Sequence, residues 1–159
     1  MNQVLLFFVK ALFVDILQCF LLVFGMQFLS KYQINWKISL LCMSFILVTI
    51  YLARMLLTFG NHTLFSLIIL ILLSITLLKI PAQKAVKIAL LLTILLFLFE
   101  AINYLVFNLF LTKESFDQFM DSDFGLATIG FSSNTMLGIT LFAIYIYRNK
   151  KEKKLTLGE

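Results

Sequence analysis

The chain has 159 residues, of which 62% are hydrophobic and 13% are charged, with a formal net charge of +5. Its mean hydropathy of +1.02 and its short polar linkers exclude a second, soluble domain. The positive charge lies beside the ends of apolar segments and not in one basic patch, so we expect no nucleic-acid partner.

Five long apolar runs fill most of the sequence. In chain order they cover residues 4–29, 38–57, 63–80, 85–111 and 124–147, and residues 148–159 form a tail. A helix needs about 20 apolar residues to cross a hydrocarbon core of about 30 Å. Continuous apolar runs favour helices over the alternating strands of a barrel. The sequence therefore predicts an all-α, polytopic membrane helix bundle with five transmembrane helices in one membrane domain, 1–159.

Basic residues alternate between successive linkers. Lysines occur in the first and third linkers, and Arg148 begins a cluster of basic residues in the tail. The second linker has no Lys or Arg, and the fourth is mainly acidic. The positive-inside rule then places the C-terminus in the cytoplasm and the N-terminus outside, with the five spans in the cell (inner) membrane. Phe116, Phe119 and Met120 predict a short amphipathic turn on the outer surface.

Four ionisable residues interrupt the predicted spans: Lys10, Asp15, Arg54 and Glu100. Such residues are costly in a membrane and mark functional sites by default. On the fourth span, Asn103 and Asn108 extend the polar stripe from Glu100 toward the outer surface. We interpret these six residues as a candidate ligand site or intramembrane polar network.

Other interpretations of the same residues stay open. Lys10 and Arg54 would reach the outer interface by snorkelling, while apolar surroundings would keep Asp15 and Glu100 protonated. A proton or ion path is a further alternative. Asp15 and Glu100 would also suit a carboxylate pair of an intramembrane hydrolase, but no motif supports one, so no catalytic residue is predicted.

Small and polar residues mark the fifth span. Gly130, Asn134 and Gly138 are spaced four apart, so they share one helix face, where small residues permit close helix approach. We interpret them as helix-packing residues; the alternative is a loosened helix that lines an outward-facing cavity. Cys19 and Cys42 both lie in apolar runs without neighbouring His or Cys, so no metal and no cofactor is predicted.

Residues 72–102 read LLSITLLKIPAQKAVKIALLLTILLFLFEAI. A short loop with Ile-Pro and lysines lies between two apolar helices, and the second helix carries a Glu; here this pattern falls on Lys79, Ile80, Pro81, Lys84, Lys87 and Glu100. The stretch resembles part of the membrane sensor region of GHKL-type bacterial histidine kinases, the group that contains peptide-sensing quorum receptors. The tail after Tyr147 leaves no room for a kinase domain. The resemblance therefore implies a kinase-less relative or a sensor half that works with another subunit.

We expect a non-enzymatic, sensor-like or regulatory membrane subunit that binds a small or peptide ligand from the outer side. Its expected partners are the lipid bilayer and either a protein at the cytoplasmic face or further copies of the chain. Two alternatives remain: a small transporter or substrate-binding transport subunit, and a structural or assembly subunit of a membrane complex. The sequence has no detectable inverted repeat, which disfavours the transporter.

Overall fold

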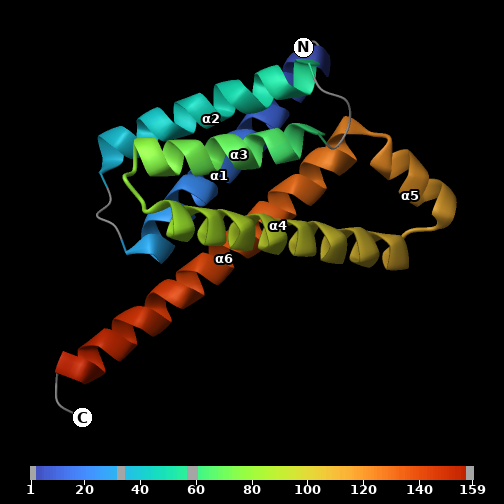
Figure 1. Cartoon of the computed structure of the whole chain (residues 1–159). Coiled ribbons are helices and arrows are strands. Elements are labelled where there is room, and N and C mark those ends of the chain that lie inside the picture. Colours follow the sequence, from blue (N-terminus) through green and yellow to red (C-terminus); the bar gives the residue numbers. More distant parts are fainter. Residues whose placement is uncertain (1–2, 32–34, 57–60, 157–159) are drawn as a thin grey trace.

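A computed structural model describes the backbone of residues 3–31, 35–56 and 61–156. It describes the side chains of residues 14–31, 35–52, 64–122, 124–148 and 150. Within these ranges the protein is all-α, with the helices α1 (Gln3–Ser30), α2 (Trp36–Leu56), α3 (Asn61–Thr76), α4 (Ala82–Phe110), α5 (Lys113–Met120) and α6 (Asp123–Thr156) (Figure 1).

Two of these helices are long and apolar enough to cross a membrane, as judged by length and composition: Ala82–Phe110 and Phe124–Arg148. Shorter apolar segments are Val14–Ser30, Trp36–Leu52 and Leu64–Thr76. The five predicted runs correspond to α1, α2, α3, α4 and α6. The all-α prediction is confirmed, and of the five predicted transmembrane helices two qualify as spans in the described chain, which also forms a sixth, short helix.

The additional helix is α5, which has 8 residues and lies where a short amphipathic turn was predicted. Thr112 caps its first turn by accepting a hydrogen bond from the Ser115 N–H at 3.4 Å. Buried Phe116 contacts the Tyr104 ring of α4 edge-on, with 4.9 Å between ring centroids. Phe119 contacts Phe107 of α4 at 5.0 Å. These aromatic contacts hold α5 against the end of α4.

Two helix ends differ from the predicted boundaries. The third run was predicted to stay helical to Ile80, but α3 ends at Thr76. Lys79 has a φ of 55°, and the Ile80 N–H bonds back to the Ser74 carbonyl at 3.0 Å, so the chain leaves the helix before Pro81. At the other end of the chain, residues 148–156 continue α6 as a helix instead of forming a separate tail.

Helix α1 is the centre of the bundle, since it contacts α2, α3, α4 and α6. Its buried side chains include Cys19, Val23 and Met26, which pack with Ile46 of α2 and Leu92 of α4. Figure 1 shows α2 and α3 side by side, with α4 next to α3 and α6 crossing behind α4. The core is thus built around the second half of α1.

The interior of the bundle holds several polar side chains among its apolar ones, and many large apolar side chains lie on its surface. The buried polar residues are Asp15, Gln27, Ser30, Ser39, Ser74, Asn103, Ser133 and Asn134. Exposed large apolar residues include Leu40, Phe45, Val48, Leu64, Ile68, Leu72, Leu90, Ile94, Leu98, Ile139 and Phe142. Buried Gln27 and Ser39 are joined across α1 and α2 by a hydrogen bond of 2.9 Å. Such extensive exposure of large apolar side chains is unusual for a water-soluble protein.

The turn from α5 to α6 depends on Gly125. The Ser122 hydroxyl caps α6 by accepting a hydrogen bond from the Gly125 N–H at 3.0 Å. A Cβ atom at Gly125 would collide with the backbone carbonyl of Phe119. At Gly138, by contrast, a Cβ would lie 3.4 Å from a Leu21 methyl, which is an ordinary van der Waals contact.

We therefore expect Gly125→Ala to destabilise the protein by about 1–3 kcal/mol, because the turn must move to admit the methyl group. Gly138→Ala is the matched control and should leave stability unchanged or slightly raise it. Thermal unfolding of the purified protein in detergent gives the comparison. Equal midpoints for the two variants would contradict the close α5–α6 contact.

Candidate functional site

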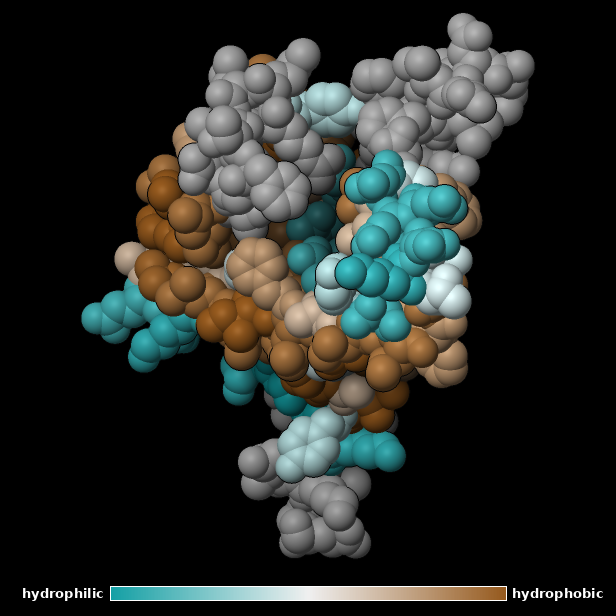
Figure 2. Space-filling model, turned by 90° about the vertical axis from the view of Figure 1, so that its right-hand side faces the viewer, coloured by the Kyte–Doolittle hydropathy of each residue, from teal (hydrophilic) through white to brown (hydrophobic). Residues whose placement is uncertain are grey.

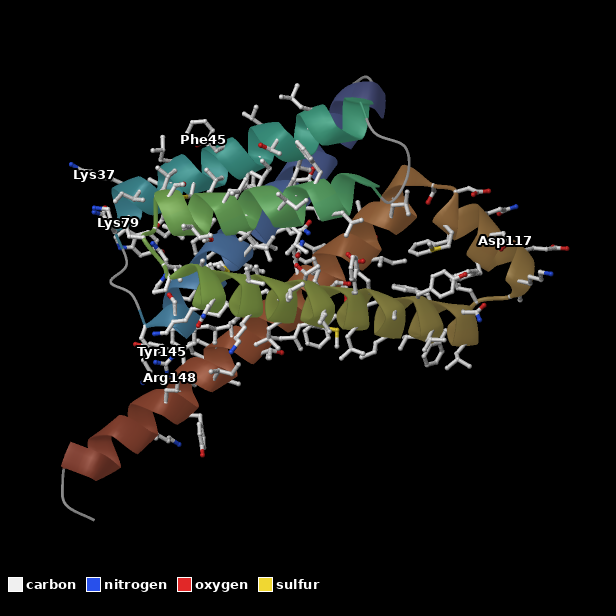
Figure 3. The ribbon with its side chains drawn as sticks, in the orientation of Figure 1. Lys37, Phe45, Lys79, Asp117, Tyr145 and Arg148 are labelled. Carbon is white, nitrogen blue, oxygen red and sulfur yellow. The ribbon has the colours of Figure 1, made fainter. Side chains whose placement is uncertain are left out.

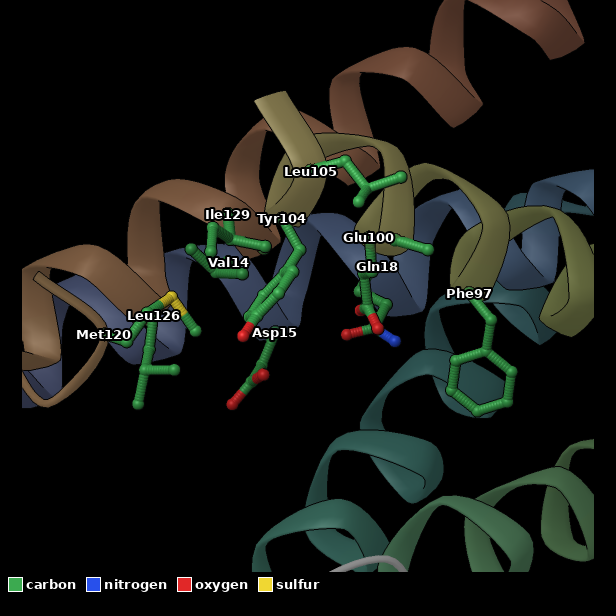
Figure 4. A pocket seen from close by; sticks show the side chains of 12 residues that line it. Val14, Asp15, Gln18, Phe97, Glu100, Tyr104, Leu105, Met120, Leu126 and Ile129 are labelled. Atoms are coloured by element: carbon green, nitrogen blue, oxygen red, sulfur yellow. The ribbon is translucent and has the colours of Figure 1, made fainter. Parts of the chain in front are cut away.

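A cavity of about 700 Å³ lies between α1, α4 and α6, and Met120 of α5 contributes to its rim. Its volume is in the range of small-molecule sites. Figure 4 shows the lining side chains, with Asp15, Gln18, Glu100 and Tyr104 as the polar ones. The full lining is Val14, Asp15, Gln18, Phe97, Glu100, Ala101, Tyr104, Leu105, Met120, Leu126, Ile129 and Gly130.

The α1 wall of the cavity is held in place by the packing of that helix. Val14, Asp15 and Gln18 are adjacent on one face because a helix repeats every 3.6 residues. Asp15 is 2% exposed, so its carboxyl group is enclosed by neighbouring helices. The Val14 carbonyl accepts a hydrogen bond of 3.3 Å from Asn134 Nδ2 of α6. This bond ties the cavity wall on α1 directly to α6.

The α4 wall follows the same helical repeat. Phe97 is followed after three and four residues by Glu100 and Ala101, and these in turn by Tyr104 and Leu105, so the five residues form one face. Glu100 is partly buried, and no hydrogen bond or ion pair joins its carboxylate to another described residue. The Tyr104 ring is held by Phe116 of α5. The α4 wall therefore presents one carboxylate and one hydroxyl between apolar side chains.

The face of the molecule that carries α5 is hollowed. Figure 2 looks onto this face and shows a recessed hydrophilic area beside the hydrophilic side chains of α5. Helix α5 and its C-terminal cap carry three exposed acidic residues, Glu114, Asp117 and Asp121. Among the described residues of this segment, Lys113 is the single exposed basic residue. The exposed surface of α5 is thus mainly acidic.

Asn103 does not line the cavity; it joins α4 to α6 one turn of helix away from Glu100. It is 7% exposed, and its Nδ2 donates to the Ser133 hydroxyl at 2.8 Å. Its Oδ1 accepts from the Ser132 hydroxyl at 3.1 Å. Both ends of the amide are satisfied, which fixes the α4 and α6 walls of the cavity relative to each other.

The three predicted packing residues of α6 face α1. A Cβ atom at Gly130 would lie 3.0 Å from Val14 Cγ1, so the absence of a side chain allows the close approach. Asn134 is 1% exposed and bonds to Val14, as described above, and Gly138 lies against Leu21. Gly130 also lines the cavity. The packing surface and the cavity wall therefore meet on one helix.

Of the remaining predicted site residues, only Asn108 has a described side chain. Asn108 is exposed on α4 and does not line the cavity. Lys10 and Arg54 fall in α1 and α2, but their side chains lie outside the described residues. The structure thus brings together Asp15 and Glu100 in the cavity and places Asn103 behind them.

Several lining residues were not selected from the sequence. Gln18 and Tyr104 follow Asp15 and Glu100 by three and four residues, so helical spacing was a usable signal for them. Phe97, Leu105 and Leu126 carry no such signal, because apolar residues are common everywhere in this chain. Only the packing of the helices distinguishes them.

Comparison of the chain with protein-family models, with curated proteins and with solved structures finds no match.

We expect Asn103→Leu to lower the free energy of unfolding by about 1–2 kcal/mol, because two hydrogen bonds between α4 and α6 are lost inside the bundle. Asn108→Leu makes the same replacement at an exposed position of the same helix and should change stability by less than about 0.5 kcal/mol. Reversible unfolding in mixed detergent micelles measures both. Similar losses for the two variants would show that the Asn103 amide does not hold the helices together.

Proposed function

We propose that the protein is a five-span cell-membrane protein that acts as a non-enzymatic, sensor-like or regulatory subunit. Its ligand would enter the cavity between α1, α4 and α6 from the outer side. Ligand binding would change the packing of α6, and a partner at the cytoplasmic face would respond. The resemblance of residues 72–102 to a histidine-kinase sensor region is consistent with this role.

The distribution of side chains supports a membrane location for all five long helices. The apolar residues exposed on α2, α3, α4 and α6 would be costly in water and favourable in lipid. Helix α3 has only 16 residues, but the apolar segment continues beyond Thr76, where Leu78 and Ile80 are also buried. Among the polar groups on the inside, Gln27 bonds to Ser39 across α1 and α2, and Asn103 bonds to Ser133 across α4 and α6, which suits a lipid environment.

The charges support the proposed orientation. Figure 3 shows Lys37, Lys79 and Arg148 at one end of the bundle and Asp117 of α5 at the other. The end with the basic residues would be cytoplasmic by the positive-inside rule. The cavity lies toward the α5 end, because Met120 contributes to its lining. A ligand would therefore arrive from outside the cell.

The observation that carries the proposal is that α6 runs unbroken from the cavity to the basic end. Leu126, Ile129 and Gly130 line the cavity, and the same helix continues to Thr156. Near the basic end, Arg148 Nη1 donates to the Phe28 carbonyl of α1 at 3.0 Å, and Arg148 Cζ lies 4.9 Å from the centre of the Phe28 ring. Helices α1 and α6 are thus connected both beside the cavity and at the opposite end.

The geometry gives less support to the transporter alternative. Transporters commonly bind their substrates between helices that are broken near the middle of the membrane. In the described chain, α4 and α6 pass the cavity as continuous helices of 29 and 34 residues. A continuous helix suits the transmission of a displacement along its length.

The sensor proposal predicts a signalling partner beside the end of α6. A photo-crosslinking residue placed at exposed Lys150 should capture a histidine kinase or a transcriptional regulator in native membranes. The same residue at exposed Phe110, at the opposite end of the bundle, is the control and should not capture it. Mass spectrometry of the crosslinked products identifies the partner.

Each other outcome contradicts the proposal. Capture of an ATPase or another transport component at Lys150 would favour the transporter. Capture of copies of the chain alone, or of the components of a larger complex without a signalling protein, would favour an assembly subunit.

A further inference from the structure

We infer that the basic end of the bundle binds anionic phospholipids of the cytoplasmic leaflet in preference to zwitterionic ones. Lysine ammonium groups would contact the headgroups, and apolar helix faces would lie along the acyl chains. This inference rests on the membrane location and the orientation in the proposed function, and it adds a partner at a surface away from the cavity. It follows from unpaired lysines, from the apolar faces that begin beside them, and from the backbone conformation of two of them.

The lysines at the basic end have no anionic partner among the described residues. Five exposed lysines lie at the helix ends that meet here: Lys31, Lys37, Lys79, Lys84 and Lys87. No hydrogen bond or ion pair joins their ammonium groups to another described residue. The sequence between Asp15 and Glu100 contains no Asp or Glu. Because like charges repel one another, an anion from outside the chain would lower the energy of this surface.

Apolar helix faces begin directly beside two of these lysines. In α2, exposed Leu41 follows Lys37 by four residues, and exposed Phe45 continues the same face one turn further (Figure 3). In α4, exposed Leu91 follows Lys87 by the same spacing. A cation at the head of an apolar face matches an anionic headgroup that is joined to acyl chains. A soluble anion would use only the charge, so the combined surface favours a lipid.

Two of the lysines have a backbone conformation that glycine would adopt with less strain. Lys31 has a φ of 63° and Lys79 a φ of 55°, and no other non-glycine residue of the described chain has a positive φ. Both follow the end of a helix, where glycine is the usual residue because a Cβ atom is costly in this conformation. A strained residue points to a function for its side chain. A cation required at this end of the bundle would account for both lysines.

Trp36 makes the lipid preference measurable, because it is the single tryptophan of the chain, is 60% exposed and directly precedes Lys37. The full chain would be reconstituted in phosphatidylcholine bilayers that contain spin-labelled phosphatidylglycerol or spin-labelled phosphatidylcholine, with the nitroxide near the headgroup. Quenching of Trp36 fluorescence at increasing fractions of each labelled lipid gives their relative affinities for this face of α2. We expect the phosphatidylglycerol to be preferred about fivefold, since one lysine beside anionic lipid contributes about that factor.

Variants assign the preference to the basic end. Lys37→Gln should remove most of the preference, whereas Lys37→Arg keeps the charge and should retain it. Lys113→Gln makes the same replacement at the start of α5, at the opposite end of the bundle, and should leave the preference unchanged. Quenching by the labelled phosphatidylcholine should be the same in every variant, because Trp36 still faces lipid.

Lys79→Gly separates the charge of this lysine from its effect on the fold. The replacement relieves the positive φ, so the thermal unfolding midpoint in phosphatidylcholine nanodiscs should equal or exceed that of the unchanged chain. It also removes a cation, so phosphatidylglycerol nanodiscs should raise the midpoint less than they do for the unchanged chain. A lower midpoint in phosphatidylcholine with an undiminished phosphatidylglycerol effect would make Lys79 a structural residue and contradict its part in lipid binding.

Equal quenching by the two lipids, a preference that survives in Lys37→Gln, or one that is lost equally in Lys113→Gln would overturn the inference. Displacement of the labelled phosphatidylglycerol by millimolar glycerol phosphate would also overturn it, because the basic end would then bind soluble anions. These results leave the crosslinking at Lys150 unchanged, so failure of the lipid preference is distinct from failure of the sensor role. If neither lipid quenches Trp36, the membrane location is refuted, and the proposed function fails with the inference.

Discussion

The close contact between α1 and α6 is the constraint on which the rest of the structure depends. Gly130 lets Val14 approach within van der Waals distance, and Asn134 bonds to the Val14 carbonyl. At the other end of the same pair, the Arg148 guanidinium bonds to the Phe28 carbonyl of α1. In the membrane location that we propose, lipid would provide little hydrophobic force between helices, so such close packing and interhelical hydrogen bonds would hold them together. Helix α1 can occupy the centre of the bundle because α6 fixes it at two separated points.

The cavity is a consequence of this arrangement. With α1 and α6 fixed together, α4 is held to α6 by the Asn103 amide and its two serine partners. The three helices then enclose a space between Asp15 and Glu100 on the side where α5 folds back. Carboxyl groups among apolar helices are energetically costly and therefore point to a function, and we propose that they bind a ligand that approaches from the α5 side. The unbroken α6 offers a direct route from that ligand to the basic end of the bundle.

Much of the fold could be predicted from the sequence, because apolar runs of about 20 residues leave few alternatives to helices. The fourth run and α4 agree closely, and Asp15 and Glu100 could be identified because charge is rare in such runs. Other features depend on packing and could not be read from a pattern. The choice of Phe97 and Leu126 as cavity residues follows from which helices are neighbours. The early end of α3 follows from the backbone hydrogen bonding around Lys79. The Asn103 side chain bonds to α6 instead of extending the polar stripe that was predicted from Glu100.

The central claim is that a water-accessible cavity opens from the outer side between α1, α4 and α6, and substituted-cysteine labelling tests it most directly. In a background with Cys19 and Cys42 replaced by serine, cysteine would be placed at Ala101, which lines the cavity, or at its neighbour Ile102, which is exposed but does not. The two positions lie at nearly the same depth, since a helix rises about 1.5 Å per residue. A membrane-impermeant thiol reagent added outside intact cells should modify Ala101→Cys much faster than Ile102→Cys. Equal rates, or labelling of Ala101→Cys only from the cytoplasmic side, would contradict the account.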